Sequence, residues 1–312
     1  MLLRSPRSAV LRAGLVAGAL ASWGCAEPVP VLAQHPVTAD TAQLMNTVRV
    51  LAADSMEGRR AGTPGAARAR RYLIGRLAAL GVAPFTDGYE QSFPLARDSS
   101  PGVNLIGAIP GSNPRGSYIV LSAHYDHVGV RRGEIYNGAD DNASGVAAVL
   151  AIAEALKKAP LRHPVIIALF DAEEGGLVGA RAFVRSPPVA LDRIGMNVNL
   201  DMVGHSDPGV LWVAGASYSA KFRPLLDSLA AAAPVVLKLG HDRAGVSGEQ
   251  DWSRSSDHAP FHAAGIPFLY FGVEDHKDYH RATDDPETLT PVFFGRAVAT
   301  VEAVLRGVDS RL

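Results

Sequence analysis

The sequence predicts an α/β fold, a three-layer αβα sandwich in which helices cover both faces of a mostly parallel, mixed β-sheet. Apolar, β-branched runs alternate along the chain with longer segments of helical periodicity. These runs are apolar almost throughout, as expected for strands that are buried on both faces. With 312 residues, 47% of them hydrophobic, the chain is long enough to form one large core.

The helices follow from periodicity and from end signals. Apolar residues recur at helical spacing in residues 40–54, and the turn-rich residues 55–65 separate this helix from the next. Gly81 is placed to end the second helix in a left-handed conformation. The expected helices are 40–54, 66–81, 145–159, 176–185, 218–233 and 291–308.

The strands are the apolar runs that lie between these helices. In a parallel sheet the ligand site lies at the carboxyl ends of the strands, so the residues that follow each run are the ones to inspect. Residues 240–257 are polar and rich in Gly and Ser, which indicates a long loop at that site. The expected strands are 104–111, 116–127, 163–174, 194–204, 209–216, 234–239 and 265–273.

Residues 1–33 have the pattern of a cleaved secretory signal peptide. Three arginines precede the apolar run 13–22, which is too short for a stable membrane span of about 20 residues. The sequence favours a cut after Ala33 and hence export to the periplasm or the medium. The alternative is a lipoprotein signal that ends at Cys25, which would leave a lipid anchor on the mature chain.

Charge and cysteine content narrow the classes of function. The formal net charge is −1, so no basic excess indicates a nucleic-acid partner. Cys25 is the only cysteine. Cleavage after Ala33 therefore leaves a mature chain without disulfides and without thiol catalysis.

Acidic and histidine side chains follow five of the predicted segments. Five separate segments place such side chains at one edge of one sheet, where packed carboxylates are unfavourable unless cations compensate them. Histidine and carboxylate ligands suit zinc or similar divalent ions. The residues are His124, Asp126, His127, Asp140, Asp141, Glu173, Glu174, Asp201 and His280.

Each of these residues taken alone has an ordinary alternative. Asp140 or Asn142, just before a helix, is typical of an N-cap. A single histidine at a strand end is commonly a hydrogen-bonded surface residue, and adjacent glutamates such as Glu173 and Glu174 are commonly solvated. The convergence of the segments favours the metal interpretation over these alternatives.

At these residues the sequence resembles metallopeptidase family 28, the dizinc exopeptidases that include secreted bacterial leucyl-type aminopeptidases. The matching motifs are "HYDHVG", "NGADDNASG", "DAEEGGLVGA", "NLDMVG", "SSDHAPF" and "DYHRATDDPETL", together with the upstream "LAADSMEGRRAGTPGAARARRYL". The motifs occur in the family's order over nearly the whole predicted mature chain. The resemblance implies the zinc-exopeptidase (phosphorylase/hydrolase-like) version of the αβα fold.

The resemblance also implies two Zn²⁺ ions per chain and their ligands. His124 and Asp201 are expected to hold one zinc, and Glu174 and His280 the other. Asp141 is expected to bridge both, because a carboxylate has two oxygens to offer.

Further residues are implied to act on the substrate or to position the ligands. Glu173 matches the general base that activates the metal-bridging water. Asp126 matches the acid that orients a ligand imidazole, and Tyr279 matches a position where some members use a tyrosine to polarise the substrate carbonyl. Asp257 and His258, in the motif on the substrate side, carry no assigned role.

The expected function is that of an exported dizinc aminopeptidase acting on peptides with a free amino terminus. Residues 40–312 are expected to form a single peptidase domain. Only residues 82–116 separate the second helix from a catalytic strand, too few for an inserted protease-associated domain. The alternatives are a carboxypeptidase or dipeptidase, a glutaminyl-cyclase-like enzyme that keeps one zinc, and a non-catalytic scaffold that has lost ligands.

Overall fold

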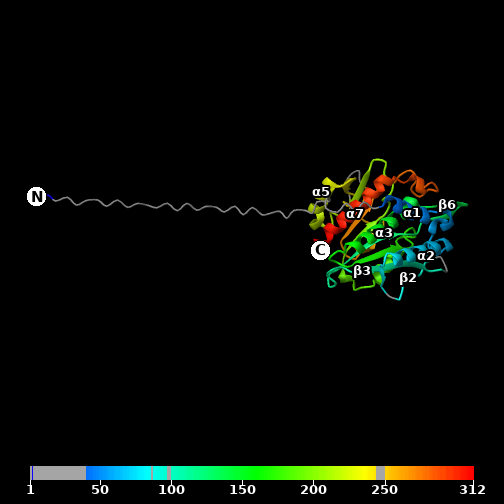
Figure 1. Cartoon of the computed structure of the whole chain (residues 1–312), viewed down its shortest axis with the longest axis horizontal. Coiled ribbons are helices and arrows are strands. Elements are labelled where there is room, and N and C mark those ends of the chain that lie inside the picture. Colours follow the sequence, from blue (N-terminus) through cyan, green and yellow to red (C-terminus); the bar gives the residue numbers. More distant parts are fainter. Residues whose placement is uncertain (1, 3–39, 86, 97–99, 244–249) are drawn as a thin grey trace.

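A mixed β-sheet forms the centre of the structure (Figure 1). This computed structural model describes residues 2, 40–85, 87–96, 100–243 and 250–312. The predicted signal peptide and its alternative end at Cys25 therefore lie outside the described residues.

The four central strands of the sheet are parallel, and antiparallel strands flank them on both sides. In the described residues the sheet has nine strands, which follow one another in space as β1 (Ala83–Pro84), β3 (Gly102–Ile109), β7 (Val165–Phe170), β4 (Tyr118–His124), β8 (Ile194–Leu200), β11 (Phe268–Gly272), β9 (Val210–Ala214) and β10 (Val236–Leu239), with β2 (Glu90–Phe93) also paired to β3. The pairs β7·β4, β4·β8 and β8·β11 are parallel, whereas β3 joins β7 and β9 joins β11 in the antiparallel sense. The prediction of a mostly parallel mixed sheet is confirmed.

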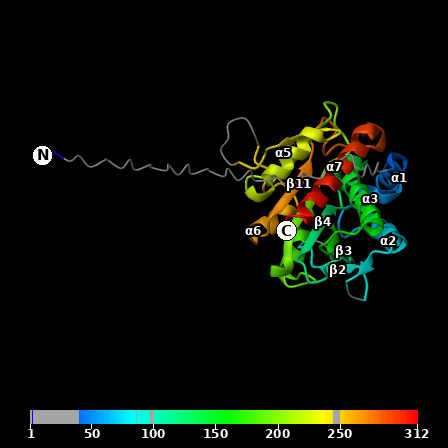
Figure 2. The same cartoon turned by 60° about the vertical axis from the view of Figure 1, so that its left-hand side comes forward.

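Helices cover both faces of this sheet, as predicted for three layers. The larger group packs on one face and consists of α1 (Thr41–Leu51), α2 (Pro64–Ala79), α3 (Gly145–Lys158), α5 (Arg223–Ala232) and α7 (Pro291–Asp309). On the other face lie α4 (Val178–Arg185) and α6 (His258–Ala263). Figure 2 shows α3 and α7 lying over the sheet, with α6 at its far side.

Strand β7 shows how one apolar run serves both layers. Val165, Ile167 and Leu169 belong to the core beneath α1, α3 and α7. Their neighbours Ile166, Ala168 and Phe170 point the opposite way, and the Phe170 ring packs edge-on against Phe183 of α4. Successive side chains of a strand point to opposite faces of the sheet, so a strand that is buried on both faces is apolar at every position. The continuous apolar run therefore predicted this strand clearly.

Local signals set the ends of the first two helices. The Asp40 carboxylate accepts a hydrogen bond from the Ala42 N–H at 2.9 Å and so caps α1. Helix α2 ends at Ala79, and Gly81 follows with φ of +66°, as predicted for a left-handed C-terminal residue.

Short elements were not predicted from the sequence. Helix α6 lies at the end of the expected long loop and is too short for helical periodicity to show. Strand β2 is an edge strand with exposed polar residues, and β5 (Gly129–Arg131) pairs with β6 (Glu134–Tyr136) in a separate two-stranded sheet. The runs 104–111 and 116–127 follow one another in sequence, but β7 lies between their strands in the sheet.

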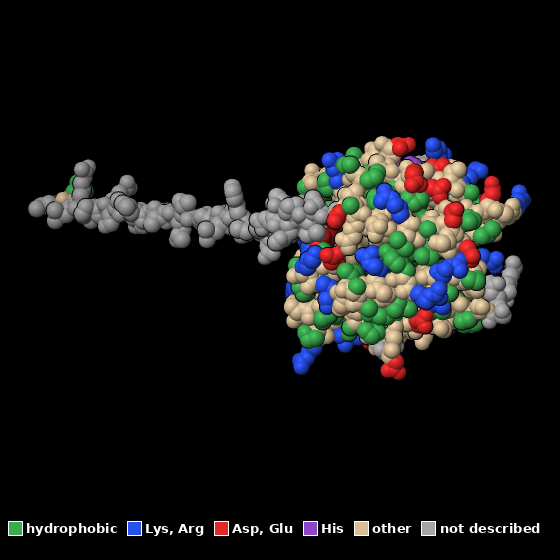
Figure 3. All heavy atoms as spheres, turned by 45° about the vertical axis from the view of Figure 1, so that its right-hand side comes forward, with side chains coloured by type: hydrophobic (Ala, Val, Ile, Leu, Met, Phe, Trp, Pro, Cys, Tyr) green, Lys and Arg blue, Asp and Glu red, His purple; other side chains and the backbone are tan. Residues whose placement is uncertain are grey.

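The outer surface mixes charges of both signs. On the face shown in Figure 3, acidic and basic side chains are interspersed with small apolar groups. Within the described part of the chain, no helix combines the length and the apolar character needed to cross a membrane.

Candidate metal centre

The carboxyl ends of the parallel strands bring the predicted site residues to one edge of the sheet. His124 ends β4, Asp201 follows β8, and the two glutamates follow β7. His280 comes from the loop after β11, and Asp141 from the π-helical turn η3 (Ala139–Ser144) that precedes α3. Residues far apart in sequence thus meet where a doubly covered sheet places its ligand site.

His124, Asp141 and Asp201 form the first group. The His124 Nε2 atom lies 3.3 Å from Asp141 Oδ1 and 3.2 Å from Asp201 Oδ1. All three side chains are buried. Their donor atoms converge as the ligands of one divalent ion would.

Asp141, Glu174 and His280 form the second group. The His280 Nε2 atom lies 3.1 Å from Asp141 Oδ2 and 3.1 Å from Glu174 Oε2. Asp141 therefore directs one oxygen to each group. Although burial alone would raise its pKa, the imidazoles of His127, His124 and His280 hold the pKa of the Asp141 carboxyl well below its usual range.

His127 also belongs to the second group, a placement that the sequence analysis did not assign. Its Nδ1 atom lies 2.8 Å from Glu174 Oε1 and 3.6 Å from Asp141 Oδ2. The ring is fully buried. The available signal was the spacing in "HYDH", which puts His127 three residues after the predicted ligand His124.

The residues present fit a pair of zinc ions. Three carboxylates and three imidazoles converge, a donor set suited to zinc. Among the described residues, the buried atoms His127 Nδ1 and Glu174 Oε1 have no polar partner beyond each other and the metal-site carboxylates, and His127 Nε2 has none. Buried polar atoms of this kind are unfavourable unless something pairs with them, and a cation between them would do so.

Asp126 holds the backbone of the glutamate turn. Its Oδ1 accepts the Glu173 N–H at 3.0 Å, and its Oδ2 accepts the Glu174 N–H at 3.4 Å. The Nδ1 of His124 hydrogen bonds to the Asp126 backbone carbonyl at 3.2 Å and lies 3.6 Å from the carboxylate. Asp126 thus lies beside the His124 imidazole, but most of its hydrogen bonding goes to the two glutamates.

The two glutamates lie beyond the strand, which differs from the sequence analysis. The expected strand 163–174 ends at Phe170, and Ala172 adopts a left-handed conformation with φ of +59°. The turn, rather than strand alternation, therefore separates the directions of Glu173 and Glu174. Asp126 accepts both amide groups and so fixes this turn.

Glu173 and Tyr279 line a pocket of about 330 Å³ beside both groups. Burial raises the pKa of the Glu173 carboxyl well above its usual range, and Asp201 and Asp257 raise it further, while His124 opposes them. The Tyr279 ring stacks on His280 with centroids 4.0 Å apart. Burial also raises the pKa of the Tyr279 phenol, so this group keeps its proton and can donate a hydrogen bond.

Two residues that the sequence analysis missed support the loop carrying Asp141. Asp284 accepts the N–H groups of Asp140 and Asp141 at 2.9 and 3.1 Å. Arg59 is fully buried and donates to four backbone carbonyls, including that of Gly138 at 2.8 Å. Burial lowers the pKa of Arg59 to about 10, so the group remains a cation near the acidic site.

The capping alternative holds for Asn142 but not for Asp140. Asn142 Oδ1 accepts the Gly145 N–H at 2.9 Å, at the first residue of α3. Asp140 instead accepts the Gly204 N–H at 2.7 Å, and its other oxygen lies 3.2 Å from His276 Nε2. The peptide bond between Asp141 and Asn142 is cis.

Asp257 and His258 occupy different environments although they are adjacent. Asp257 is fully buried near Glu173, and neither of its carboxylate oxygens has a partner in the described part of the chain. His258 stacks on Phe268 and meets the Trp252 carbonyl at 2.8 Å through Nε2. Burial lowers its pKa to about 3, so His258 is a neutral packing residue beneath the pocket.

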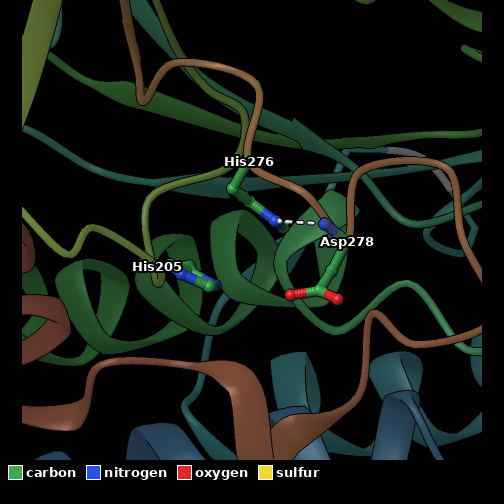
Figure 4. Close-up of side chains that lie close together, drawn as sticks. All are labelled: His205, His276 and Asp278. Atoms are coloured by element: carbon green, nitrogen blue, oxygen red, sulfur yellow. Dashed lines mark hydrogen bonds between the residues drawn. The ribbon is translucent and has the colours of Figure 1, made fainter.

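A second histidine-containing group lies at the same edge of the sheet (Figure 4). The His205 and His276 rings stack with centroids 4.2 Å apart, and Asp278 lies beside them. His276 Nδ1 accepts the Asp278 N–H at 3.3 Å, and its Nε2 faces Asp140. Both nitrogens of His276 are therefore in use.

The family model described as "Peptidase family M28" matches residues 104–305. A relative named leupeptin-inactivating enzyme 1, from Streptomyces exfoliatus, is 29% identical over 85% of this chain and 56% of its own length. The aminopeptidase YwaD of Bacillus subtilis is 34% identical over 54% of this chain and 35% of its own length. The chain thus spans about half of the first relative and a third of the second.

Solved structures share the fold at low sequence identity. A zinc aminopeptidase from Bacillus subtilis superposes with a TM-score of 0.68 at 18% identity, covering 85% of this chain and 94% of that one. A glutaminyl cyclase from Porphyromonas gingivalis also gives a TM-score of 0.68, at 21% identity, covering 87% of this chain and 98% of that one. Both structural similarities are evidence for the fold alone, and they agree with the three-layer architecture of this chain.

Proposed function

The chain belongs to peptidase family M28, and on that basis we propose that it is a dizinc aminopeptidase that removes residues from the free amino ends of peptides. The position of Asp141 carries the proposal. Its Oδ1 lies 3.3 Å from His124 Nε2, and its Oδ2 lies 3.1 Å from His280 Nε2. A carboxylate shared between two groups of ligands is the arrangement that a pair of metal ions needs.

The residues around the ligands supply the proton transfers. Two zinc ions bound here would polarise the scissile carbonyl and lower the pKa of a water that they share. Glu173 takes the proton of the attacking water and passes it to the leaving amine, and its burial favours the protonated state between these steps. Tyr279 donates its hydroxyl hydrogen to the carbonyl oxygen as negative charge develops there.

The pocket suits an amino-terminal residue. Asp275 lines it and does not belong to the expected ligand set, so it offers negative charge to a substrate ammonium group. Trp252 and Tyr270 form an apolar wall for the first side chain. A pocket of about 330 Å³ is at the small end of ligand sites, which fits one residue rather than a long peptide segment.

The decisive assay compares amino-acid nitroanilides with their N-acetylated counterparts, with and without a chelator. We expect hydrolysis of the free compounds, no hydrolysis of the acetylated ones, and loss of activity on chelation that zinc restores. Release of carboxyl-terminal residues from amino-blocked peptides would instead identify a carboxypeptidase. Cleavage restricted to two-residue peptides would identify a dipeptidase.

The structural likeness to a glutaminyl cyclase makes cyclisation the second candidate. The resemblance described above implies that cyclases keep one zinc, whereas both groups of ligands are complete here. Incubation with an amino-terminal glutaminyl peptide, followed by mass spectrometry, separates the two. A mass loss of one ammonia without peptide cleavage would favour the cyclase.

Export is a separate part of the proposal and depends on the pattern of residues 1–33. We expect the mature chain to begin after Ala33. Amino-terminal sequencing and intact-mass measurement of protein from the native host would test this. A mature chain that begins with a lipid-modified Cys25 would establish the membrane-anchored alternative.

A further inference from the structure

We propose that His127 is a ligand of the second metal ion, so that four protein side chains hold that ion and three hold the first. This inference rests on the proposed dizinc function. It concerns a residue outside the expected ligand set of His124, Asp141, Glu174, Asp201 and His280.

The first argument is the convergence of the donor atoms. His127 Nδ1 and Glu174 Oε1 lie 2.8 Å apart, and no other described residue hydrogen bonds to either atom. A divalent cation could take the place of the proton that this pair shares. Asp141 Oδ2 adjoins the same pair, 3.6 Å from His127 Nδ1.

The second argument is the spacing of the donors. Ligands arranged tetrahedrally around zinc, with bonds of about 2.0–2.1 Å, are separated by roughly 3.4 Å. His127 Nδ1 to Asp141 Oδ2 is 3.6 Å, and His280 Nε2 is 3.1 Å from both Asp141 Oδ2 and Glu174 Oε2. These three separations are within about 0.3 Å of that value, whereas His127 Nδ1 to Glu174 Oε1, at 2.8 Å, is shorter. The separations therefore suit donor atoms gathered around one ion.

The third argument is burial. The His127 ring has no exposed surface, and its Nε2 likewise has no partner in the part of the chain that is described. In the metal-free protein the ring relies on Nδ1, which faces the Glu174 and Asp141 carboxylates. A cation bound at Nδ1 would use that lone pair without exposing the ring, which gives a physical reason for a histidine at this position.

The ring is also held in place before any ion binds. Gly138 adopts φ of +59°, and a Cβ atom there would lie 2.5 Å from His127 Cγ. The ring therefore packs directly on the Gly138 backbone, whose carbonyl is fixed by Arg59 at 2.8 Å. This packing limits rotation of the His127 side chain and presents Nδ1 to the second group.

The consequence is an unequal pair of metal sites. Four protein ligands would hold the second ion, and the water that the two ions share would be a fifth ligand there. Three ligands at the first position, His124, Asp141 and Asp201, leave room for substrate. We therefore expect the second ion to bind more tightly and to leave last during chelation.

The test uses Zn²⁺ itself on the purified chain. Zinc per chain is measured by mass spectrometry after dialysis against buffers of graded free zinc, for wild type, His127→Leu, His127→Asn and His205→Gln. In wild type we expect two zinc ions bound with different affinities. In His127→Leu the affinity of the tighter site should fall by about 10- to 100-fold. His127→Asn, which places an oxygen near the Nδ1 position, should restore part of the affinity, and His205→Gln should match wild type.

Cobalt substitution distinguishes a ligand from a residue that only positions Glu174. The visible absorption of bound Co²⁺ depends on its ligands and coordination geometry. Loss of His127 as a ligand should change the spectrum of the tighter site, whereas a positioning role should lower affinity and leave the spectrum unchanged. If His127→Leu binds zinc with wild-type affinities, the proposal is overturned. If the leucine variant does not fold, the zinc affinities of His127→Asn decide the question in its place. A wild-type chain that binds no zinc would instead refute the proposed function.

Discussion

Two groups of histidine and carboxylate side chains lie at the same edge of the sheet, and only one has the features of a metal centre. In the first, the donor atoms of His124, Asp141 and Glu174 converge with those of three further residues. In the second, His205, His276 and Asp278 are equally close together (Figure 4). Proximity of suitable residue types is therefore not sufficient to identify a site.

The difference lies in how the protein itself uses the donor atoms. Both nitrogens of His276 have partners, Asp140 through Nε2 and the Asp278 N–H through Nδ1. In the first group, by contrast, the donor atoms face one another: His124 Nε2 lies 3.3 Å from Asp141 Oδ1 and 3.2 Å from Asp201 Oδ1. A metal centre is recognised by donor atoms that converge on one another rather than on other groups of the protein.

The largest effect is expected from Asp141→Ala. Because each oxygen of Asp141 faces one group of ligands, its removal should weaken both metal positions and reduce hydrolysis to background. Zinc content after dialysis should fall from two ions per chain toward none. Loss of only one ion would refute the shared role of Asp141.

Glu173→Gln should separate chemistry from metal binding. The amide cannot accept the proton of the attacking water, so kcat should fall by about 10²- to 10⁴-fold. Zinc content should remain at two per chain, because Glu173 is not among the ligands. Near-wild-type turnover on leucine nitroanilide would show that another group is the base.

The sequence predicted where the site lies better than it predicted the turns and hydrogen bonds that hold the site residues in place. Parallel strands place their carboxyl ends together, so residues such as Asp201 and His124 could be assigned to one edge from the alternation of elements alone. Glu173 and Glu174 were expected on the strand, but their directions depend on a left-handed turn at Ala172 and on Asp126. The end of the strand could not be judged, because no Gly or Pro follows Phe170 before Gly175.

Residues that act through long-range backbone contacts gave no local signal. Arg59 was expected in a turn-rich loop, yet it is fully buried and binds carbonyls of residues up to 79 positions away. Asp284 supports the loop of Asp141 from 143 positions away. His127 could not be distinguished from an ordinary buried histidine until the structure showed which polar atoms surround its ring.

Asp284→Asn tests whether such support matters for metal affinity. Asp284 accepts two successive N–H groups, and an amide can accept only one of them without turning its NH₂ group toward the other. We expect zinc affinity to fall by about 10- to 100-fold, the range seen when groups that orient ligands are lost. Titration with a competing chelator would measure the change.

Asp309→Asn is the matched control for this change. Asp309 accepts the N–H groups of Arg162 and His163 at 2.9 and 2.8 Å, a similar pair of backbone contacts at the opposite edge of the sheet, and its Oδ1 also lies 2.9 Å from His163 Nδ1. Both variants should lose about 1–3 kcal/mol of stability, because each leaves a buried donor unsatisfied. Only Asp284→Asn should lower zinc affinity. An equal loss in the control would mean that the effect reflects general destabilisation.

The smallest effect on metal binding is expected from His205→Gln, which tests the comparison between the two groups directly. Its ring is buried against His276, so the substitution should lower stability by about 1 kcal/mol. Such a loss corresponds to a change of roughly 2–4 °C in Tm for a domain of this size. Zinc content and both affinities should equal those of wild type, because both nitrogens of His276 are engaged by Asp140 and the Asp278 N–H. A third zinc ion in the wild-type chain that disappears in His205→Gln would show that stacked, hydrogen-bonded imidazoles can still rearrange to bind metal, and the direction of the donor atoms would then fail as a criterion.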